Sequence, residues 1–138
     1  MLLKQISIFL ENSVGRIEEV TRVLAEADIN LRAISIADTR DFGILRIIVD
    51  KHEDALKTLE NSGFAIRLTD VAAVEIPDSP GSLQFVLELF QKSKINIEYL
   101  YAFLQNKPGR AAVIFKLEDM ARGQQVIEEN NLSLIQKI

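Results

Sequence analysis

Hydrophobic and polar residues follow the same order twice along the chain. Apolar residues at every second position predict an opening strand in each half, over residues 3–10 and 71–76. Apolar residues three and four positions apart then predict a helix with one buried stripe. The expected core positions are Ile6, Ile8, Leu10, Ile17, Val20, Leu24 and Ala27 in the first half and Ala72, Val74, Ile76, Leu83, Val86 and Phe90 in the second.

The rest of each half predicts two further strands, a second helix and a last strand. Second strands open at Asn30 and Asn96, and turn-rich hairpins lead to apolar third strands. This order is that of the ferredoxin-like βαββαβ unit, so we expect domains over residues 1–69 and 70–138. The later elements are expected at 44–49, 52–61 and 64–68 in the first half and at 111–115, 118–130 and 132–135 in the second, where Gly123 weakens the helix.

Three landmarks recur at one interval, which indicates an internal repeat. The interval is 66 residues each time (81 − 15, 96 − 30 and 109 − 43). Halves of about 65–70 residues are near the lower limit for independent stability, so we expect them to support each other. The landmark pairs are Gly15 and Gly81, Asn30 and Asn96, and Gly43 and Gly109.

The composition narrows the classes of partner and compartment. A net charge of −4 and a pI near 5.1 argue against nucleic acid bound through its phosphates. The chain has no cysteine, which fits a reducing compartment and removes thiolate chemistry. The N-terminal residues lack the pattern of a signal peptide, and no apolar run approaches the roughly 18 residues of a membrane span. We therefore expect a cytoplasmic protein without a membrane partner.

The turn before the first helix of each half carries the candidate binding chemistry. Gly15 or Gly81 lets a ligand approach the backbone, and the free N–H groups and helix dipole there favour a small anion such as a carboxylate. An α-amino acid supplies a carboxylate, and its ammonium group needs acceptor oxygens. The candidate acceptors are the side chains of Asn12, Asp78, Asn30 and Asn96.

A purely structural role is the alternative for these residues. Polar side chains before a helix cap its N-terminus, proline is tolerated at the first helical position, and asparagine favours the turn from helix to strand. The duplication of the motif favours binding over this alternative. In the structural interpretation Ser13, Ser79, Asn12 and Asp78 cap the helices, Val14 and Pro80 open them, and Asn30 and Asn96 shape a turn.

Both turns resemble the ACT domain, a small regulatory module of amino-acid metabolism. That family has an acidic or amide residue, then Pro-Gly-aliphatic, and later Asn-Ile at the head of the second strand. The second half matches closely, with Asp78-Ser79-Pro80-Gly81-Ser82-Leu83 and Asn96-Ile97-Glu98, whereas the first half departs at Val14 and Arg16. The resemblance covers the whole chain and implies ligand contacts at Asn12, Ser13, Val14, Gly15, Asn30, Asp78, Pro80, Gly81, Ser82, Leu83 and Asn96.

The resemblance also implies an architecture and a function. Paired ACT modules commonly lie side by side, which implies an eight-stranded antiparallel sheet with four helices on one face and residues 31–37 beside 97–103. A strand exchange is the alternative, because the connection near Thr69 and Asp70 is very short. The implied function is an amino-acid-binding regulatory protein without catalytic activity or cofactor. The alternative is a regulatory subunit acting in trans on a biosynthetic enzyme, since Asn96-Ile97-Glu98 also resembles the small subunits of acetolactate synthase.

Other kinds of site find little support in the sequence. No serine or lysine has a visible activating base and no phosphate-binding loop is present, so no catalytic residue is expected. His52 is the only histidine, and beside Glu53 and Asp54 we expect a solvated helix start rather than a metal site. RNA-binding RRM domains share the topology, but around Phe9 and Phe115 the basic, aromatic-rich motif of that family is missing.

The second strand of the second half carries a row of aromatic residues. Strand alternation places this row on one face and Leu100 and Leu104 on the other. With Ile34 and Leu100 expected toward the helices, the aromatic face has no helix cover, which is more apolar surface than a small monomer leaves in water. We therefore expect a homodimer packed through this face. The aromatic residues are Tyr99, Tyr101 and Phe103, and burial of a ligand by one of the tyrosines is the alternative.

Overall fold

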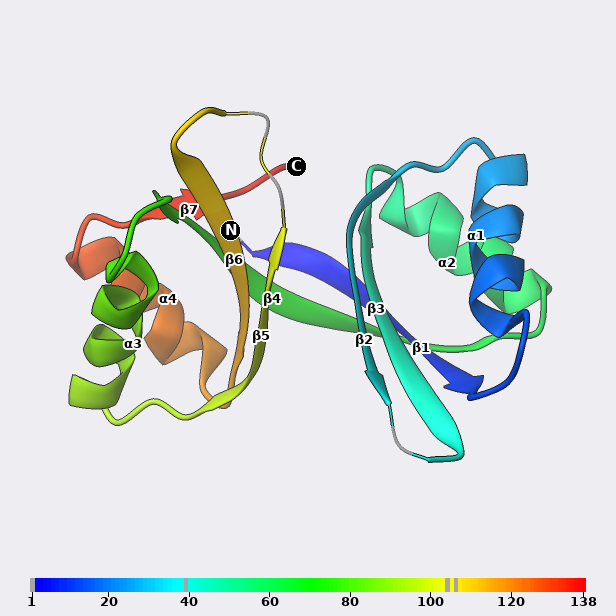
Figure 1. Cartoon of the computed structure of the whole chain (residues 1–138), viewed down its shortest axis with the longest axis horizontal. Coiled ribbons are helices and arrows are strands. Elements are labelled where there is room, and N and C mark those ends of the chain that lie inside the picture. The colour runs from blue at the N-terminus through cyan, green and yellow to red at the C-terminus, as the bar shows by residue number, and fades with distance from the viewer. Residues whose placement is uncertain (1, 39, 104, 106) are drawn as a thin grey trace. The chain divides into compact units, whose positions relative to one another are not determined.

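The computed structural model describes residues 2–38, 40–103, 105 and 107–138. These residues form an α+β structure with four helices and seven strands (Figure 1). The chain divides into two compact units. The first unit comprises Lys4–Thr69, and the second comprises Asp70–Ile138 together with Leu2 and Leu3. The division between Thr69 and Asp70 falls inside a strand and not in a loop.

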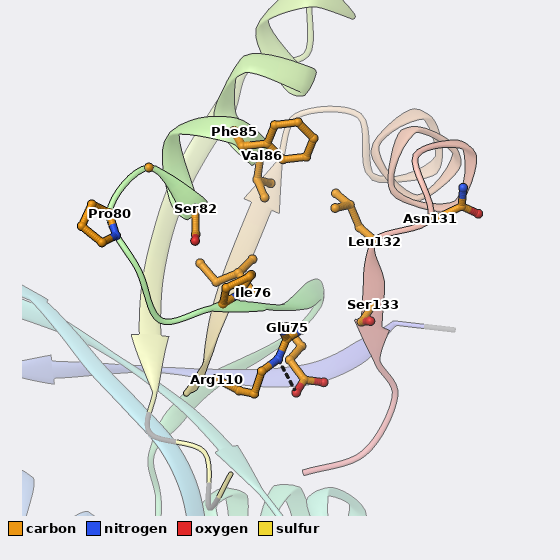
Figure 2. Close-up of a pocket in the computed structure, with 12 residues that line it drawn as sticks. Glu75, Ile76, Pro80, Ser82, Phe85, Val86, Arg110, Asn131, Leu132 and Ser133 are labelled. Carbon is orange, nitrogen blue, oxygen red and sulfur yellow. Dashed lines mark hydrogen bonds and ion pairs between the residues drawn. The ribbon is translucent and has the colours of Figure 1, made fainter. Parts of the chain in front are cut away.

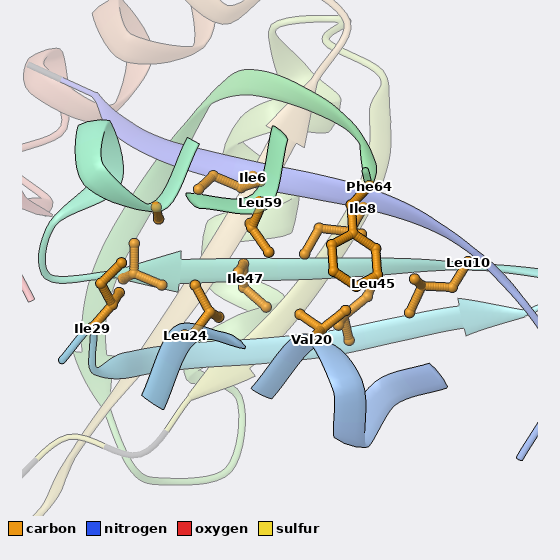
Figure 3. Packing of buried hydrophobic residues seen from close by; sticks show 12 residues of the cluster. Ile6, Ile8, Leu10, Val20, Leu24, Ile29, Leu45, Ile47, Leu59 and Phe64 are labelled. Carbon is orange, nitrogen blue, oxygen red and sulfur yellow. The ribbon is translucent and has the colours of Figure 1, made fainter. Parts of the chain in front are cut away.

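The first unit packs its helices on one face of its strands, around a core that Figure 3 shows. Ile6, Ile8 and Leu10 belong to this core, which confirms the strand predicted from their spacing. The expectation for Ile17 and Ala27 is wrong, because the core covers only the middle turns of their helix and leaves both ends exposed. The elements are β1 (Leu3–Glu11), α1 (Arg16–Glu26), β2 (Leu31–Asp38), β3 (Phe42–Val49), α2 (His52–Asn61) and the start of β4 (Ala65–Pro77).

The second unit repeats this arrangement with its own core. Ala72, Val74 and Ile76 lie in that core, as their spacing predicts. Phe90 and Phe115 meet edge to face in the middle of it, with ring centroids 5.3 Å apart. After β4 the elements are α3 (Ser82–Lys92), β5 (Ile97–Phe103), β6 (Arg110–Leu117), α4 (Met120–Glu129) and β7 (Ser133–Ile135).

Gly123 has a packing role in α4. A glycine inside a helix costs about 1 kcal/mol relative to alanine, which is the weakening expected from the sequence. In the structure Gly123 is buried, and an added Cβ would collide with Cδ1 of the fully buried Leu117 in β6. The glycine therefore allows α4 to lie close against β6.

The described residues form seven strands instead of the expected eight. The last strand of the first repeat and the first strand of the second are one strand, β4, of 13 residues. No glycine or proline interrupts residues 65–76, and the β-branched Thr69 and Val71 favour extended backbone where a connection was expected. The strand order is β2-β3-β1-β4-β6-β5, and β7 also pairs with β4.

The strand pairs of the described residues do not include the expected pair between the second strands of the two repeats. β2 pairs with β3, β5 pairs with β6, and β2 and β5 stand at opposite ends of the strand order. The repeats are connected through the continuous β4 instead. β7 pairs with β4 at Val74 and Leu134, within the second unit, so the described strands show no exchange between repeats.

The strand register confirms the predicted faces of β2 and β5. Residues directly opposite each other in an antiparallel pair share a face of the sheet. Ile34 lies opposite Ile47 and Leu100 lies opposite Phe115, and both partners belong to the cores beneath the helices. The row of aromatic residues in β5 therefore lies on the face away from the helices.

The exposed fractions of Tyr101, Ile34 and Leu100 differ from those expected from the faces alone. Tyr101 is only 9% exposed, whereas Ile34 is 49% and Leu100 is 38% exposed. Ile34 and Leu100 stay exposed because they lie on the outermost strands of the described sheet, β2 and β5. Leu104 lies outside the described residues. The buried Tyr101 removes the reason for expecting a second copy on the aromatic face.

The two repeats differ in the length of one hairpin. The register joins residues 6 and 47 in the first repeat and residues 72 and 115 in the second. First strands are therefore 66 residues apart (72 − 6) and third strands 68 apart (115 − 47). By strand register Gly43 corresponds to Ala111 and not to Gly109. The pair of Gly43 and Gly109 is therefore not a true landmark of the repeat. Glycines recur near both positions because a hairpin needs turn-forming residues.

Candidate ligand site

A tight turn joins β4 to α3. The Ser82 N–H donates to the Ser79 carbonyl at 3.3 Å, and Gly81 has φ 87° and ψ −9°. With Pro80 before it, this is the pattern of a type II turn, whose third residue takes φ of about +80° and ψ of about 0° and therefore favours glycine. Gly15 has φ 87° and ψ −6° at the same place in the first unit.

The serines of these turns do not cap the helices, contrary to the structural interpretation of the motif. Gly15 and Gly81 occupy the N-cap positions, and within the described residues neither helix has a side-chain cap hydrogen bond. Ser79 Oγ instead lies 3.0 Å from Ser82 Oγ. The first N–H groups of α3, at the positive end of its dipole, therefore lack a side-chain acceptor in the described structure.

A pocket of about 480 Å³ opens beside this turn (Figure 2). Three of the site residues expected from the sequence line it, namely Pro80, Gly81 and Ser82. The edge of β4 lines another side, because β7 begins opposite Glu75 and does not extend along the last residues of β4. The other lining residues are Glu75, Ile76, Pro77, Phe85, Val86, Arg110, Asn131, Leu132 and Ser133.

One end of the pocket is charged. Arg110 Nε donates to Glu75 Oε1 at 3.1 Å, and the Glu75 side chain is only 15% exposed. Lys107 Nζ lies 3.8 Å from the other oxygen, Oε2, which is longer than a hydrogen bond. Arg110 therefore fixes the Glu75 carboxylate through one oxygen, and the second oxygen retains the capacity to accept from a ligand cation.

The other end of the pocket is apolar. Figure 2 shows Phe85, Val86 and Leu132 on the side away from the Glu75–Arg110 pair. Val86 and Leu132 belong to the packed interior of the second unit, whereas Phe85 is 53% exposed. A concave site of this size, mostly apolar with a few convergent polar groups, is typical of small-molecule binding.

Asp78 and Leu83 do not line the pocket formed by the described residues. Asp78 donates its backbone N–H to the Gly109 carbonyl at 2.9 Å, which ties the turn to the neighbouring hairpin. Leu83 packs against the core of the second unit. Both residues therefore have structural roles that their positions in the motif also explain.

The asparagines lie at the far end of the first helix in each repeat. Asn96 follows α3, whose 11 residues span about 16 Å, and its carbonyl accepts from the Glu118 N–H at 3.0 Å. Asn30 occupies the same place after α1 and donates its N–H to Asp50 Oδ1 at 3.0 Å. Within each unit, therefore, the structure does not bring these asparagines to the glycine turn.

The equivalent position in the first unit is filled by its own side chains. The Arg16 guanidinium lies over the Phe64 ring, 5.6 Å from the centroid, and Arg16 Nη1 lies 2.7 Å from Glu19 Oε2. Asn12, Ser13, Val14 and Gly15 form the turn before this cluster. A ligand beside Gly15 would have to displace the Arg16 side chain. The counterparts of Arg16, Glu19 and Phe64 in the second repeat are Ser82, Phe85 and Leu132.

The charged end of the pocket also has no charged counterpart in the described part of the first unit. Phe9 and Phe42 stand at the positions of Glu75 and Arg110, once the longer hairpin is taken into account. Both phenylalanines are exposed, at 46% and 62%. The glycine turn is thus duplicated, whereas the chemistry around it is confined to the second repeat.

Sequence reasoning missed the residues that give the pocket its chemistry. Glu75 interrupts the otherwise apolar run of residues 71–76, and that interruption is the available signal. Phe85 is an apolar residue outside the buried stripe of its helix, which is a weaker signal. Residues 131–133 and Arg110 come from segments distant in sequence, and only the fold brings them together.

Within residues 2–38, 40–103, 105 and 107–138, no group of three or more histidine, cysteine or acidic side chains is placed to bind a metal ion. None of the helices in the same residues has the length and apolarity needed to cross a bilayer.

Comparison with known proteins identifies the family. The family described as an ACT domain pair matches residues 1–138. A crystal structure of a protein from Bacteroides thetaiotaomicron has a TM-score of 0.92 at 42% identity, over 98% of this chain and 92% of that chain. No curated protein matches the chain.

More distant structures share the fold. The regulatory subunit of aspartate kinase from Thermus thermophilus has a TM-score of 0.68 at 21% identity, over 93% of each chain. The corresponding subunit from Thermus flavus has a TM-score of 0.62 at 20% identity, over 94% of this chain and 93% of that chain. The resemblance noted from the two glycine turns is confirmed: this chain belongs to the family of ACT domain pairs.

Proposed function

We propose that the protein is a cytoplasmic regulatory protein that binds an α-amino acid and has no catalytic activity of its own. The observation that carries this proposal is the pocket beside Gly81, where groups of both charges meet. The N-terminus of α3 favours the ligand carboxylate, and Ser82 adds a hydroxyl donor. The second oxygen of Glu75 accepts from the ligand ammonium group. An α-amino acid carries both charges on one carbon and fits this arrangement.

The proposed site lies in the second repeat and takes one ligand per chain. In the first repeat, the Arg16 guanidinium and its ion pair with Glu19 already occupy the corresponding position. Of the residues expected from the sequence, Pro80, Gly81 and Ser82 contact the ligand in this proposal, and Glu75 and Arg110 are added to them.

A thermal-shift screen of the purified chain against the common amino acids tests the proposal. A ligand present at about a hundred times its dissociation constant adds roughly 2.7 kcal/mol of stability. For a chain of this size that raises the midpoint by several degrees. Glycolic acid and ethylamine, which each carry one of the two charges, serve as controls and should have much smaller effects. If no amino acid raises the midpoint, the proposed function is wrong.

The protein is also proposed to form a homodimer through the outer edge of β2. Ile34 and Ile36 are 49% and 48% exposed on this strand, and an open strand edge with apolar side chains favours pairing with another copy. Sedimentation equilibrium at micromolar concentration should give about 31 kDa, twice the mass of the 15.5 kDa chain. Ile36→Lys should give the monomer mass, whereas Phe85→Lys, on a helix of the other unit, should leave the dimer intact. A monomeric wild-type chain would contradict the proposal.

A regulatory subunit that acts in trans on a biosynthetic enzyme is the second candidate. The exposed isoleucines of β2 also suit contact with a different protein. The aspartate kinase regulatory subunits show that this fold occurs in proteins of that type. Copurification of a larger enzyme subunit, lost in the Ile36→Lys variant, would favour this candidate over a self-contained sensor.

A further inference from the structure

Charged and apolar residues line opposite ends of the pocket beside Gly81. Glu75 and Arg110 lie at one end, and Phe85 and Leu132 lie at the other (Figure 2). Ser82 lies between the two ends, at the first turn of α3. A ligand anchored by its α-carbon groups near Ser82 and Glu75 would direct its side chain along α3 toward Phe85.

The charged side chains of the pocket lie together at one end (Figure 2). Among the described residues, Glu75 and Arg110 are the only charged side chains that line it. Lys107 stands just beyond them, 3.8 Å from Glu75 Oε2. The ammonium and carboxylate groups of an α-amino acid add one charge of each sign, which leaves the net charge of this end unchanged. A third charge on the ligand side chain would lie against Phe85 and Leu132 without a counterion. Such a charge loses hydration and gains no partner in return.

The apolar end offers surface that a ligand can cover. Phe85 is 53% exposed, although it lies one turn after Ser82 at the mouth of the pocket. Covering an aromatic ring and the adjacent Leu132 with an aliphatic side chain removes apolar area from water, which favours binding. A polar side chain at the same place would lose its own hydration.

We propose that this site selects α-amino acids whose side chains are apolar and uncharged, with Phe85 and Leu132 as the residues that determine the selectivity. This inference rests on the proposed function, because it requires that the pocket binds an amino acid. It adds the chemical class of the ligand and the place where its side chain lies.

Isothermal titration calorimetry of the full chain tests the ligand class. Norleucine, leucine and methionine form the apolar set, and lysine and glutamate form the charged set. Norleucine and lysine have the same carbon skeleton and differ only by the terminal ammonium group. The best apolar ligand should bind at least roughly tenfold more tightly than either charged one, as expected when a single feature of a side chain is discriminated.

The outcomes separate this inference from the proposed function. If lysine or glutamate binds as tightly as the best apolar ligand, the ligand class is wrong, although the amino-acid site remains. If none of the common amino acids binds, both proposals are overturned. A clear preference for the apolar set supports both.

Phe85→Glu tests where the side chain of the ligand lies. The first repeat has Glu19 at the same position of its helix, so the substitution copies a residue that this fold accepts. The preference for norleucine over lysine should fall by roughly tenfold or more, because the new carboxylate can pair with the lysine ammonium group. Phe42→Glu makes the same change at an exposed phenylalanine outside the pocket and should leave the preference unaltered. A Phe85→Glu chain that folds and keeps the wild-type preference would overturn the assignment of Phe85.

Discussion

Gly81→Val should abolish ligand binding, with a loss of affinity of at least about a hundredfold, in a chain that remains folded. A Cβ at this residue meets no atom within 4 Å, because it points into open space beside the turn, where the proposed ligand approaches the backbone. Two further methyl groups would obstruct that approach. Calorimetric titration with the best amino acid found by the thermal screen measures the loss.

The same substitution in the first repeat provides a matched control. Gly81 and Gly15 both have φ 87°, so valine is strained at either site by on the order of 1–3 kcal/mol. Both variants should therefore lose similar stability in thermal melts. Only Gly81→Val should lose binding, because Arg16 fills the position beside Gly15. Equal loss of binding in the two variants would mean that strain or a second site, and not obstruction of the pocket, is responsible.

Phe115→Ala should produce the largest loss of stability among simple substitutions in the second unit. The ring is fully buried in β6 and makes an edge-to-face contact with Phe90, at 5.3 Å between centroids. Truncation of a buried phenylalanine removes its apolar contacts and leaves a cavity, at a cost of about 3–5 kcal/mol. Urea denaturation followed by circular dichroism measures the change in the free energy of unfolding.

Phe85→Ala is the matched control for that measurement. The ring is 53% exposed on α3, so its removal should change the free energy of unfolding by no more than about 0.5 kcal/mol. A loss at Phe115 no larger than that at Phe85 would show that the core of the second unit is not packed as described.

The alternation of apolar residues was sufficient to predict most elements and both cores. Ile6, Ile8 and Leu10 lie in one core and Ala72, Val74 and Ile76 in the other, because a strand with one face buried has only one arrangement of its side chains. α2 also begins and ends at the predicted residues, His52 and Asn61. Periodicity describes each element separately, and each of these correct predictions concerns a single element.

The wrong predictions concern how the elements connect and how they cover one another. The repeat suggested two separate strands around Thr69, whereas local backbone preference there favours one continuous strand. Strand alternation predicts the correct face for Ile34, but it carries no information on whether β2 is an outermost strand with little cover. Whether a side chain is buried depends on its neighbours in space as well as on its face.

The candidate site shows the same limit. The glycine turn is local, and its motif could be found in the sequence. Glu75 and Arg110 are 35 residues apart and meet only because β4 and β6 are adjacent in the sheet. A constant interval of 66 residues would pair Arg110 with Ile44 (110 − 66). The true counterpart of Arg110, Phe42, emerges only from the strand register.

The continuous β4 has a consequence for proteolysis. Tandem modules are usually cut apart in the linker between them, since a protease needs several residues of extended, unpaired backbone in its cleft. Here the boundary at Thr69 and Asp70 lies within a 13-residue strand, so cleavage there requires local unfolding of the sheet. Leu2, which packs against the core of the second unit, would also be left on the other fragment. A stable fragment produced by limited digestion should therefore not begin at Asp70, and the two repeats should be degraded together.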